Sequence, residues 1–405
     1  MGAIEDKLNR LMTDGQAASD GGNLPEAIRL WRQAADGALA ASPCRPETAC
    51  SALVRCGRAH ACNNNSDSTK QAFDAASAVI QRFKLFNTTT HALFLAGLAE
   101  AKLYFGDMPG RGSLLEEARN ILLRAADPKQ AFLLAELTTQ LASFREGERK
   151  HREVIDLIAE AYGAFRQSAV ALQSSPHGHS LEHLQQMILA KAHLELKDHV
   201  QARACADRAI RTAEGAFGKD SFYALEAHLC MSRVLMGPDP AEAERHVCIV
   251  VDRPIPSDPR YAAIIADATN YLGLIRLRRS EFAEAQNLFE RCLACERLRL
   301  PPHHPTIATA LNNIAFACRE QGKLVESETH QDAALKMYEK TVGVEHPLYA
   351  NALKNLALLR HRQGSSREAE EAANHALAIM AKALGGEHES TLKMRQQLSP
   401  ILGAS

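Results

Sequence analysis

Long apolar runs are missing from this chain of 405 residues. No stretch reaches the roughly eighteen consecutive apolar residues that a membrane-spanning helix requires, so we expect no membrane span. Aromatic residues make up only 5 % of the sequence, with a single Trp, whereas Ala and Leu are abundant. Because Ala and Leu have high helix propensity, this composition favours helices over sheets.

An excess of charge is also missing, since 47 basic residues face 48 acidic ones and the net charge is −1. Such a balance provides no field that would attract nucleic acid or an anionic membrane, so we expect neither as a partner. The first residues, MGAIEDKLNRL, contain acids where a signal peptide has bases and an apolar block. Asp6 replaces the Ser or Thr of a myristoylation motif. We therefore expect a soluble, intracellular, cytoplasmic protein.

Metal-binding patterns are weak, and we expect no metal and no cofactor. Cys292 and Cys295 have the spacing of half a zinc site, but they lie within a predicted helix and no second pair follows. Four further cysteines are spaced by six, which turns each about 240° from the last on a helix, so they cannot converge. These are Cys44, Cys50, Cys56 and Cys62. The histidines of two predicted loops, His177, His179, His303 and His304, are interpreted as solvated.

Catalytic motifs are absent as well. The sequence contains no glycine-rich phosphate loop after a strand, no GxSxG and no HExxH. Carboxylates such as Glu368 and Glu370 belong to a charged helix face. We therefore expect that the protein is not an enzyme and has no small-molecule substrate.

What the sequence does contain is a repeat between 302 and 389, with an offset of 42 residues. His304-Pro305 recurs as His346-Pro347, and the histidine returns a third time as His388. Gly322 recurs as Gly364. A fixed period of this length is typical of a helical solenoid, in which each unit is one helix pair that buries its apolar face against its neighbours. The period predicts an all-α, right-handed superhelical solenoid of antiparallel helix pairs, and hence a binding scaffold.

The domain organisation follows from the same pattern. Residues 1–175 contain divergent helical hairpins without a clean period, and 176–389 contain five 42-residue repeats. A tail at 390–405 is expected to cap the last repeat. The segment from Ser174 to His179 is the candidate boundary or hinge, and the proline-rich segment from Asp252 to Arg260 is predicted to be a loop.

Several repeated segments resemble a known family: LNNIA at 311–315, LKNLA at 353–357, QG at 321–322 and 363–364, and LGGEH at 384–388. Together with His-Pro, they resemble the 42-residue tetratricopeptide repeat of the kinesin light chain and nephrocystin-3 type. The resemblance is strong over 302–389 and weak over 1–175. The chain has no coiled-coil heptads like those of a kinesin light chain, so it resembles the repeat class and not that protein.

Most of the repeated residues have a structural role. Gly322 and Gly364 fall between two helices, where a left-handed cap needs no Cβ. Pro305 and Pro347 can begin helices, because the first helical residue has no use for its N–H. Small residues where the two helices of a pair cross let them approach closely. These are Gly273, Ala315 and Ala357.

The resemblance also implies a candidate site. In similar proteins the first helix of each pair lines a concave groove, and two positions of that helix point into it. Carried over by register, these positions are Asp267, Thr309 and Asn351, then Asn270, Asn312 and Lys354, with Asn313 and Asn355 alongside. An amide side chain both donates and accepts, so a row of amides could hold the backbone of an extended peptide. Alternatively, Asn313 and Asn355 hydrogen-bond within the fold and only fix helix packing.

Three functions remain open at this stage. The first is a non-catalytic protein-interaction scaffold or adaptor that binds an extended or helical partner segment in the groove. The others are a structural subunit of a large cytoskeletal or ciliary assembly, and a regulatory partner of an enzyme. A clamp for a C-terminal carboxylate, as in chaperone-binding tetratricopeptide domains, is not expected. Lys354 and Asn355 fall at suitable places, but the later Asn and basic residues are missing.

Overall fold

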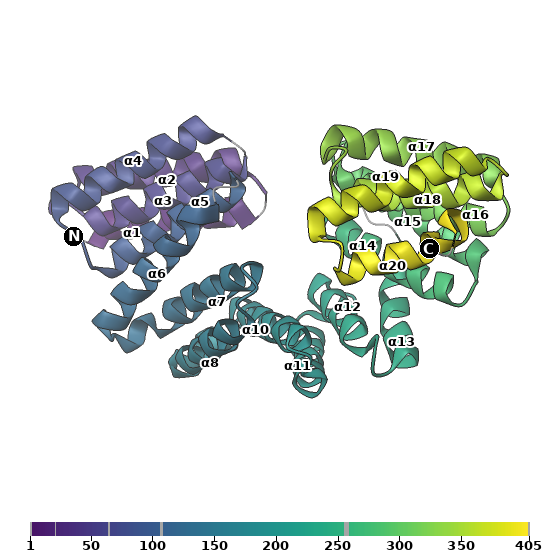
Figure 1. Ribbon diagram of the computed structural model, residues 1–405. Helices are drawn as coiled ribbons and strands as arrows, with labels where there is room; N and C mark the ends of the chain where they lie inside the picture. The colour runs from purple at the N-terminus through teal and green to yellow at the C-terminus, as the bar shows by residue number, and fades with distance from the viewer. Residues whose placement is uncertain (1, 21, 64, 106–107, 255–258, 404–405) are drawn as a thin grey trace. The chain divides into compact units, whose positions relative to one another are not determined.

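The computed structural model describes residues 2–20, 22–63, 65–105, 108–254 and 259–403. These residues form helices only, without a strand in any of the described ranges. The chain divides into two compact units, Met1–Ala216 (unit 1) and Phe217–Ser405 (unit 2). Figure 1 shows both units built from helices that follow one another as hairpins. None of the helices in the described ranges is long and apolar enough to cross a membrane.

Unit 1 contains eleven α-helices and one short 3₁₀ helix in its described residues. Their bounds are α1 Gly2–Asp20, α2 Leu24–Ala40, α3 Pro46–Cys62, α4 Ser66–Phe83, α5 Thr89–Tyr104, α6 Met108–Ala125, η1 Pro128–Gln130, α7 Ala131–Gly147, α8 His151–Gln167, α9 Val170–Gln173, α10 Pro176–Glu195 and α11 His199–Phe217.

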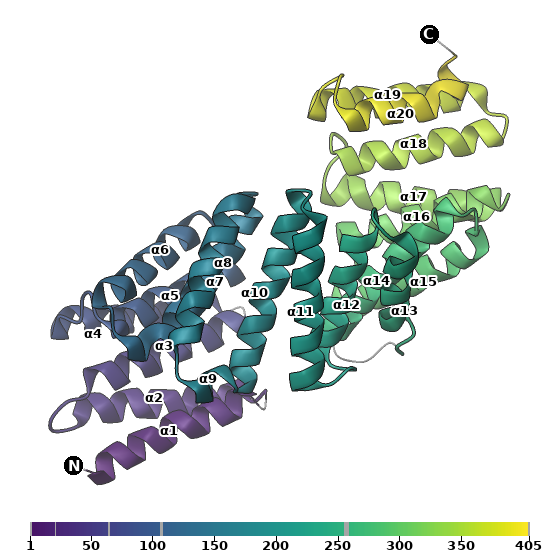
Figure 2. The same cartoon turned by 90° about the horizontal axis from the view of Figure 1, so that it is seen from below.

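Unit 2 contains α12 Phe222–Leu235, α13 Pro240–Val251, α14 Pro259–Arg278, α15 Phe282–Arg299, α16 Pro305–Glu320, α17 Leu324–Thr341, α18 Pro347–Arg362, α19 Ser366–Leu384 and α20 Glu389–Leu402. In Figure 2, α17, α18 and α19 lie in successive layers, and each packs against the helix before it. The predicted all-α solenoid of helix pairs is confirmed within each unit.

Local sequence fixes where the helices of the C-terminal repeats begin. Pro305 and Pro347 are the first residues of α16 and α18, as predicted. The preceding histidine is the N-cap in each case: Nδ1 of His304 accepts a hydrogen bond from the Thr306 N–H at 3.2 Å, and His346 caps α18 in the same way. The repeated histidine is thus a helix-capping residue.

The helix pairs turn at glycines and pack through small residues. Gly322 and Gly364 have φ angles of +79° and +82°, as the sequence predicted. A Cβ on Gly273 of α14 would lie 2.6 Å from the ring of Phe289 on α15, so only glycine allows this close packing. Helix α20, from the predicted tail, buries Met394 and Leu398 in the core formed by α18 and α19.

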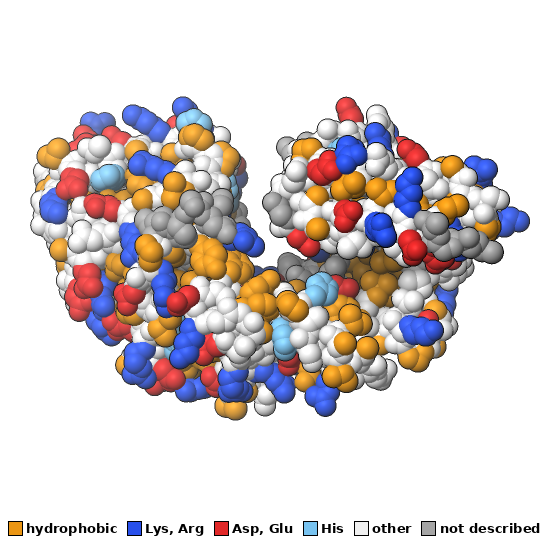
Figure 3. Space-filling view, turned by 180° about the vertical axis from the view of Figure 1, so that it is seen from behind, with side chains coloured by type: hydrophobic (Ala, Val, Ile, Leu, Met, Phe, Trp, Pro, Cys, Tyr) orange, Lys and Arg blue, Asp and Glu red, His pale blue; other side chains and the backbone are white. Residues whose placement is uncertain are grey.

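The surface of each unit mixes the two signs of charge. On the side drawn in Figure 3, Lys and Arg side chains alternate with Asp and Glu side chains over both units, and single apolar side chains lie between them. This side therefore has no extended area of one sign, in agreement with the net charge of −1.

The segment 174–179, which the sequence suggested as a boundary or hinge, contains the start of helix α10. Helix α10 begins at Pro176, where the Ser175 hydroxyl accepts a hydrogen bond from the Gly178 N–H at 3.0 Å. Because α10 packs on α7 and α8, it belongs to unit 1, and the division falls at Phe217 instead. His177 and His179 are therefore helical and not in a loop. The predicted loop 252–260 lies partly outside the described residues, at 255–258.

Candidate functional site

The predicted groove residues lie on the first helices of three successive pairs in unit 2. Asn270 is on α14, Asn312 on α16 and Lys354 on α18, and all three are partly exposed. One helical turn further along lies an apolar row, and two turns along lies a charged row, each with the same 42-residue spacing. The apolar row is Leu274, Phe316 and Leu358, and the charged row is Arg278, Glu320 and Arg362. We call these three rows the first-helix face.

Amide side chains connect neighbouring repeats behind this face. The Asn313 Nδ2 group donates to Oδ1 of Asn270 at 2.9 Å. One repeat later, Asn355 Nδ2 donates to Oδ1 of Asn312 at 3.0 Å. The buried Gln331 of α17 also donates to Asn312, at 3.1 Å. Asn313 and Asn355 therefore hydrogen-bond to the preceding repeat, and Asn355 is only 5 % exposed.

The other predicted groove residues differ in whether their side chains form hydrogen bonds or ion pairs. Asp267 pairs with Arg233 of the preceding first helix, with 3.0 Å between Oδ2 and Nη2. The Thr309 hydroxyl lies 2.8 Å from the hydroxyl of Tyr338 on α17. Asn351 and Lys354 form no side-chain hydrogen bond or ion pair with any residue that the structure describes. These two partly exposed side chains retain their full hydrogen-bonding capacity.

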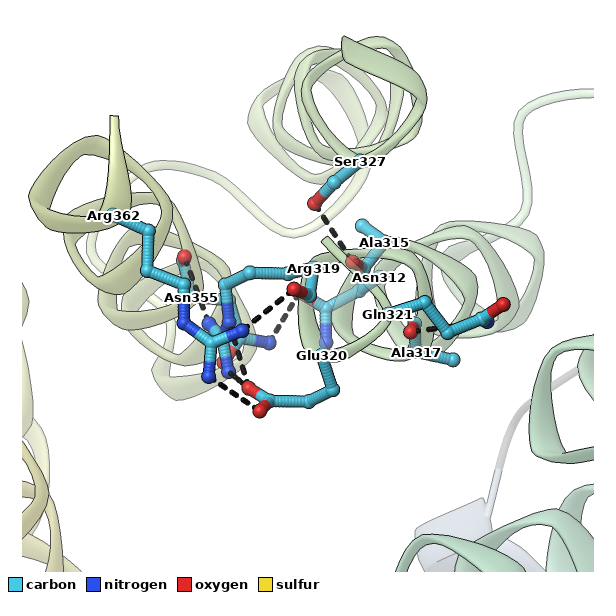
Figure 4. A network of polar contacts seen from close by, with 9 residues as sticks. All are labelled: Asn312, Ala315, Ala317, Arg319, Glu320, Gln321, Ser327, Asn355 and Arg362. Carbon is cyan, nitrogen blue, oxygen red and sulfur yellow. Dashed lines mark hydrogen bonds and ion pairs between the residues drawn. The ribbon is translucent and has the colours of Figure 1, made fainter. Parts of the chain in front are cut away.

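Sequence reasoning missed an ion-pair network around the buried Arg319, beside these residues (Figure 4). Arg319, only 3 % exposed, donates to Oε1 of Glu320 through Nε at 3.1 Å and through Nη2 at 2.9 Å. Its Nη1 donates to the backbone oxygen of Asn355 at 3.2 Å. From α18, Arg362 donates to the Arg319 carbonyl at 2.6 Å and pairs with Oε2 of Glu320 at 2.5 Å. The network joins α16 to α18.

Burial and neighbouring charges set the protonation of this region. Burial raises the pKa of Glu320, but hydrogen bonds from Arg319 and Arg362 outweigh it, so that this pKa lies below its usual range. Burial, followed by the charge of Arg319, lowers the pKa of Lys354 to about 8. At neutral pH, Lys354 is thus a cation that is poorly solvated and unpaired within the described chain. Such a group favours an anionic partner.

Neither the cysteines nor the histidines form a metal site in the described residues. No group of three or more His, Cys, Asp or Glu side chains there could hold a metal ion. Cys292 and Cys295 are buried on α15, and burial raises the pKa of Cys292 to about 12. A thiol with such a pKa remains protonated and unreactive at neutral pH.

The family comparison agrees with this geometry. A family model for the tetratricopeptide repeat matches residues 306–382, which comprise α16 to most of α19. Residues 306–382 are therefore tetratricopeptide repeats. The C-terminal repeats have the 42-residue period of the kinesin light chain type. No curated protein matches the sequence significantly.

Solved structures that resemble this chain have little sequence identity to it. The apo form of RapI has 11 % identity and a TM-score of 0.63, and covers 95 % of this chain and 99 % of its own. The apo form of the quorum sensor NprR from B. thuringiensis has 10 % identity and a TM-score of 0.52, with coverages of 87 % and 98 %. A putative kinesin light chain from Podosopora anserina has 20 % identity and a TM-score of 0.43, with coverages of 51 % and 98 %.

Proposed function

We propose that this chain is a non-catalytic protein-interaction scaffold that binds an extended or helical segment of a partner protein across the first-helix face of unit 2. A solenoid of stacked helix pairs offers an extended surface for such a segment. The observation that carries the proposal is the pair Asn351 and Lys354. Both are partly exposed and have no partner in the described chain, and both lie beside amides that neighbouring repeats hold in place.

The rows of the face suggest what each part of a partner would contact. Amides and Lys354 can bind backbone groups or a carboxylate, because they offer donors that the fold leaves unused. The apolar row beside them can accept side chains of a partner, and Leu274 in that row is 39 % exposed. Alternation of polar and apolar contacts is the arrangement that peptide-binding surfaces use for affinity and specificity.

Charge further favours acidic residues in the partner. The three rows of the face contain three cationic side chains, Arg278, Lys354 and Arg362, and one carboxylate, Glu320. Complementary charge of this kind speeds association and excludes partners of the wrong sign. Since the whole chain is close to neutral, this excess is local to the face.

A peptide selection tests the proposal even though the partner is unidentified. A displayed library of random twelve-residue peptides is selected on the full chain, and the affinity of the best peptides is measured by fluorescence anisotropy. The N351A/K354A variant removes the two unengaged side chains and leaves the amide bonds between repeats intact. The matched control is K336A/N374A, which removes the same residue types from exposed positions of the second helices α17 and α19.

We expect the N351A/K354A variant to bind about tenfold more weakly or worse, since loss of a charged and an amide contact costs roughly 1.4 kcal/mol or more. The K336A/N374A control should bind like the wild type. Equal affinity of all three proteins would exclude this face. It would favour a structural subunit that is held through other surfaces.

A further inference from the structure

Unit 1 contains a cavity for which no sequence pattern accounts. Its volume is about 610 Å³, within the range of small-ligand pockets. Residues of the first helices α3, α5 and α7 form its walls, with contributions from α1, α2 and His177 of α10. The cavity is therefore lined mainly by the first helices of its pairs, in the half of the chain that the family model does not match.

Part of the cavity lining is apolar. Leu93 of α5 lines it and is 36 % exposed, and Leu133 and Leu137 of α7 lie in the same wall. A Cβ on Gly97 of α5 would lie 2.5 Å from Cγ1 of Val54 on α3, so glycine is needed for the close approach of these two walls. An apolar side chain entering the cavity would be removed from water against these residues.

Most charges around the cavity are already paired. Arg58 pairs with Glu100, with 2.7 Å between Nε and Oε2. Glu136 binds Nε2 of His177 at 2.6 Å, and this hydrogen bond raises the pKa of the imidazole. Both carboxylates of the wall therefore have a partner, and neither is available to a further cation.

Arg55 is the exception. Its Nη1 donates to Oε1 of Gln16 at 2.7 Å, and its guanidinium carbon lies 5.9 Å from the centre of the Trp31 ring. Gln16 in turn donates to Asp20 at 2.8 Å, so an amide separates Arg55 from that carboxylate. Among the residues that the structure describes, Arg55 has no ion-pair partner. Burial and the nearby Arg58 lower the pKa of Arg55, as expected for a cation that lacks a carboxylate.

The geometry points to a second binding site in this cavity, for a short peptide segment that places a carboxylate against Arg55 and an adjacent apolar side chain against Leu93 and Leu133. Two further groups of the lining, the amide of Gln140 and the hydroxyl of Ser51, form no side-chain hydrogen bond within the described chain. They can form hydrogen bonds with the backbone N–H and C=O groups of a peptide. A simple fatty acid has no such backbone groups. The site is independent of the surface proposed in unit 2.

The carboxylate could be the C-terminus of the peptide or an acidic side chain, and the probes distinguish these sources. Three pools of hexapeptides, random at the other positions but without Asp or Glu there, are compared on the full chain by affinity selection and mass spectrometry. The first has a free C-terminus after Leu, the second has an amidated C-terminus after Leu, and the third is amidated with an internal Leu-Glu. Decanoic acid is the fourth probe, and tests for a lipid ligand.

Two variants address the site without removing its core. R55Q removes the charge and keeps a polar side chain, and L93D replaces an apolar lining residue of the cavity by a carboxylate. The matched control is R32Q, which changes an exposed arginine of α2 that does not line the cavity. Circular dichroism melts of each variant show whether unit 1 remains folded.

We expect the first or the third pool to bind the wild type, with affinities at least about tenfold weaker for R55Q and L93D and unchanged for R32Q. Equal retention of all three pools would overturn the role of the carboxylate. Binding of decanoic acid alone would overturn the assignment of a peptide as the ligand. Absence of any binding, or equal binding by R55Q, would overturn the site. None of these results depends on Asn351 or Lys354, so the two proposals fail separately.

Discussion

Asn313 donates its side-chain amide to Oδ1 of Asn270 in the preceding repeat, 2.9 Å away. The relationship recurs one repeat later between Asn355 and Asn312 at 3.0 Å. The donating asparagines, Asn313 and Asn355, thus hydrogen-bond within the fold, as one of the two interpretations of the sequence has it. A groove role for Asn270 and Asn312 stays a prediction.

Loss of one such bond should weaken unit 2. We expect N355A to lower its free energy of unfolding by about 1 kcal/mol, the usual value of a partly buried hydrogen bond. Urea denaturation followed by circular dichroism measures this change. The control N374A removes an exposed asparagine of α19 and should change the stability by less than about 0.5 kcal/mol. Equal stability of N355A and N374A would mean that the amide hydrogen bonds between repeats do not stabilise unit 2.

The Glu320 carboxylate should stabilise the contact between α16 and α18. In E320Q, the buried Arg319 loses its only carboxylate partner in the described chain. We expect a loss of about 1–3 kcal/mol at pH 7, below the full cost of a buried pair because Glu320 is partly exposed. The control E339Q changes an exposed glutamate of α17 and should have little effect.

The same pair predicts a pH dependence. The pKa of Glu320 in the folded protein lies below the ordinary value of 4.5. Its contribution to stability is therefore fully present above pH 4.5 and is lost as the pH falls through the lower, folded-state pKa. The stability difference between wild type and E320Q should shrink below pH 4.5. A difference that stays constant down to pH 3 would contradict the assignment.

Lys354 should have the opposite effect on stability, because burial lowers its pKa from 10.5 to about 8. Between these two values the unfolded chain binds more protons than the folded one, so this group makes stability rise with pH there. Below pH 8 its charge costs free energy. We expect K354M to stabilise unit 2 at pH 7 by on the order of 1–3 kcal/mol, with the upper figure reduced by residual solvation.

Urea denaturation of wild type and K354M at pH 7 and pH 10 gives the required comparison. The advantage of the variant should be larger at pH 7 and nearly absent at pH 10. K336M, at an exposed position of α17, should be close to wild type at both. Destabilisation by K354M at pH 7 would show that the lysine is better solvated, or better paired, than the structure indicates.

Much of the fold could be predicted, because the responsible residues act locally. Pro305 begins a helix and Gly322 turns the chain between two helices. Proline and glycine have these effects at such positions of any helical hairpin. The segment around Ser175 was interpreted as a candidate boundary or hinge, although Ser175 and Pro176 are also a good helix start. Only its packing on α7 and α8 distinguishes these alternatives, and that packing involves residues far apart in the sequence.

The candidate site was less predictable. The 42-residue register assigned Asn270, Asn312 and Lys354 to successive first helices, and they lie on α14, α16 and α18, but their role in binding stays a prediction. It could not reveal Arg319, because the equivalent positions hold Leu277 and His361, so nothing repeats there. The apolar row of Leu274, Phe316 and Leu358 does repeat, and the same register would have found it. The unit 1 cavity has no periodic signal and follows only from three-dimensional packing.

The central claim is that a partner segment lies across the first-helix face of unit 2, and photo-crosslinking tests it most directly. A peptide selected on the full chain is synthesised with benzoylphenylalanine near its centre, irradiated in the complex, and its attachment site is mapped by mass spectrometry. Crosslinks to residues of α14, α16 and α18 are the predicted result. Crosslinks confined to α15, α17 and α19 would contradict the claim, because they would place the partner on the second helices.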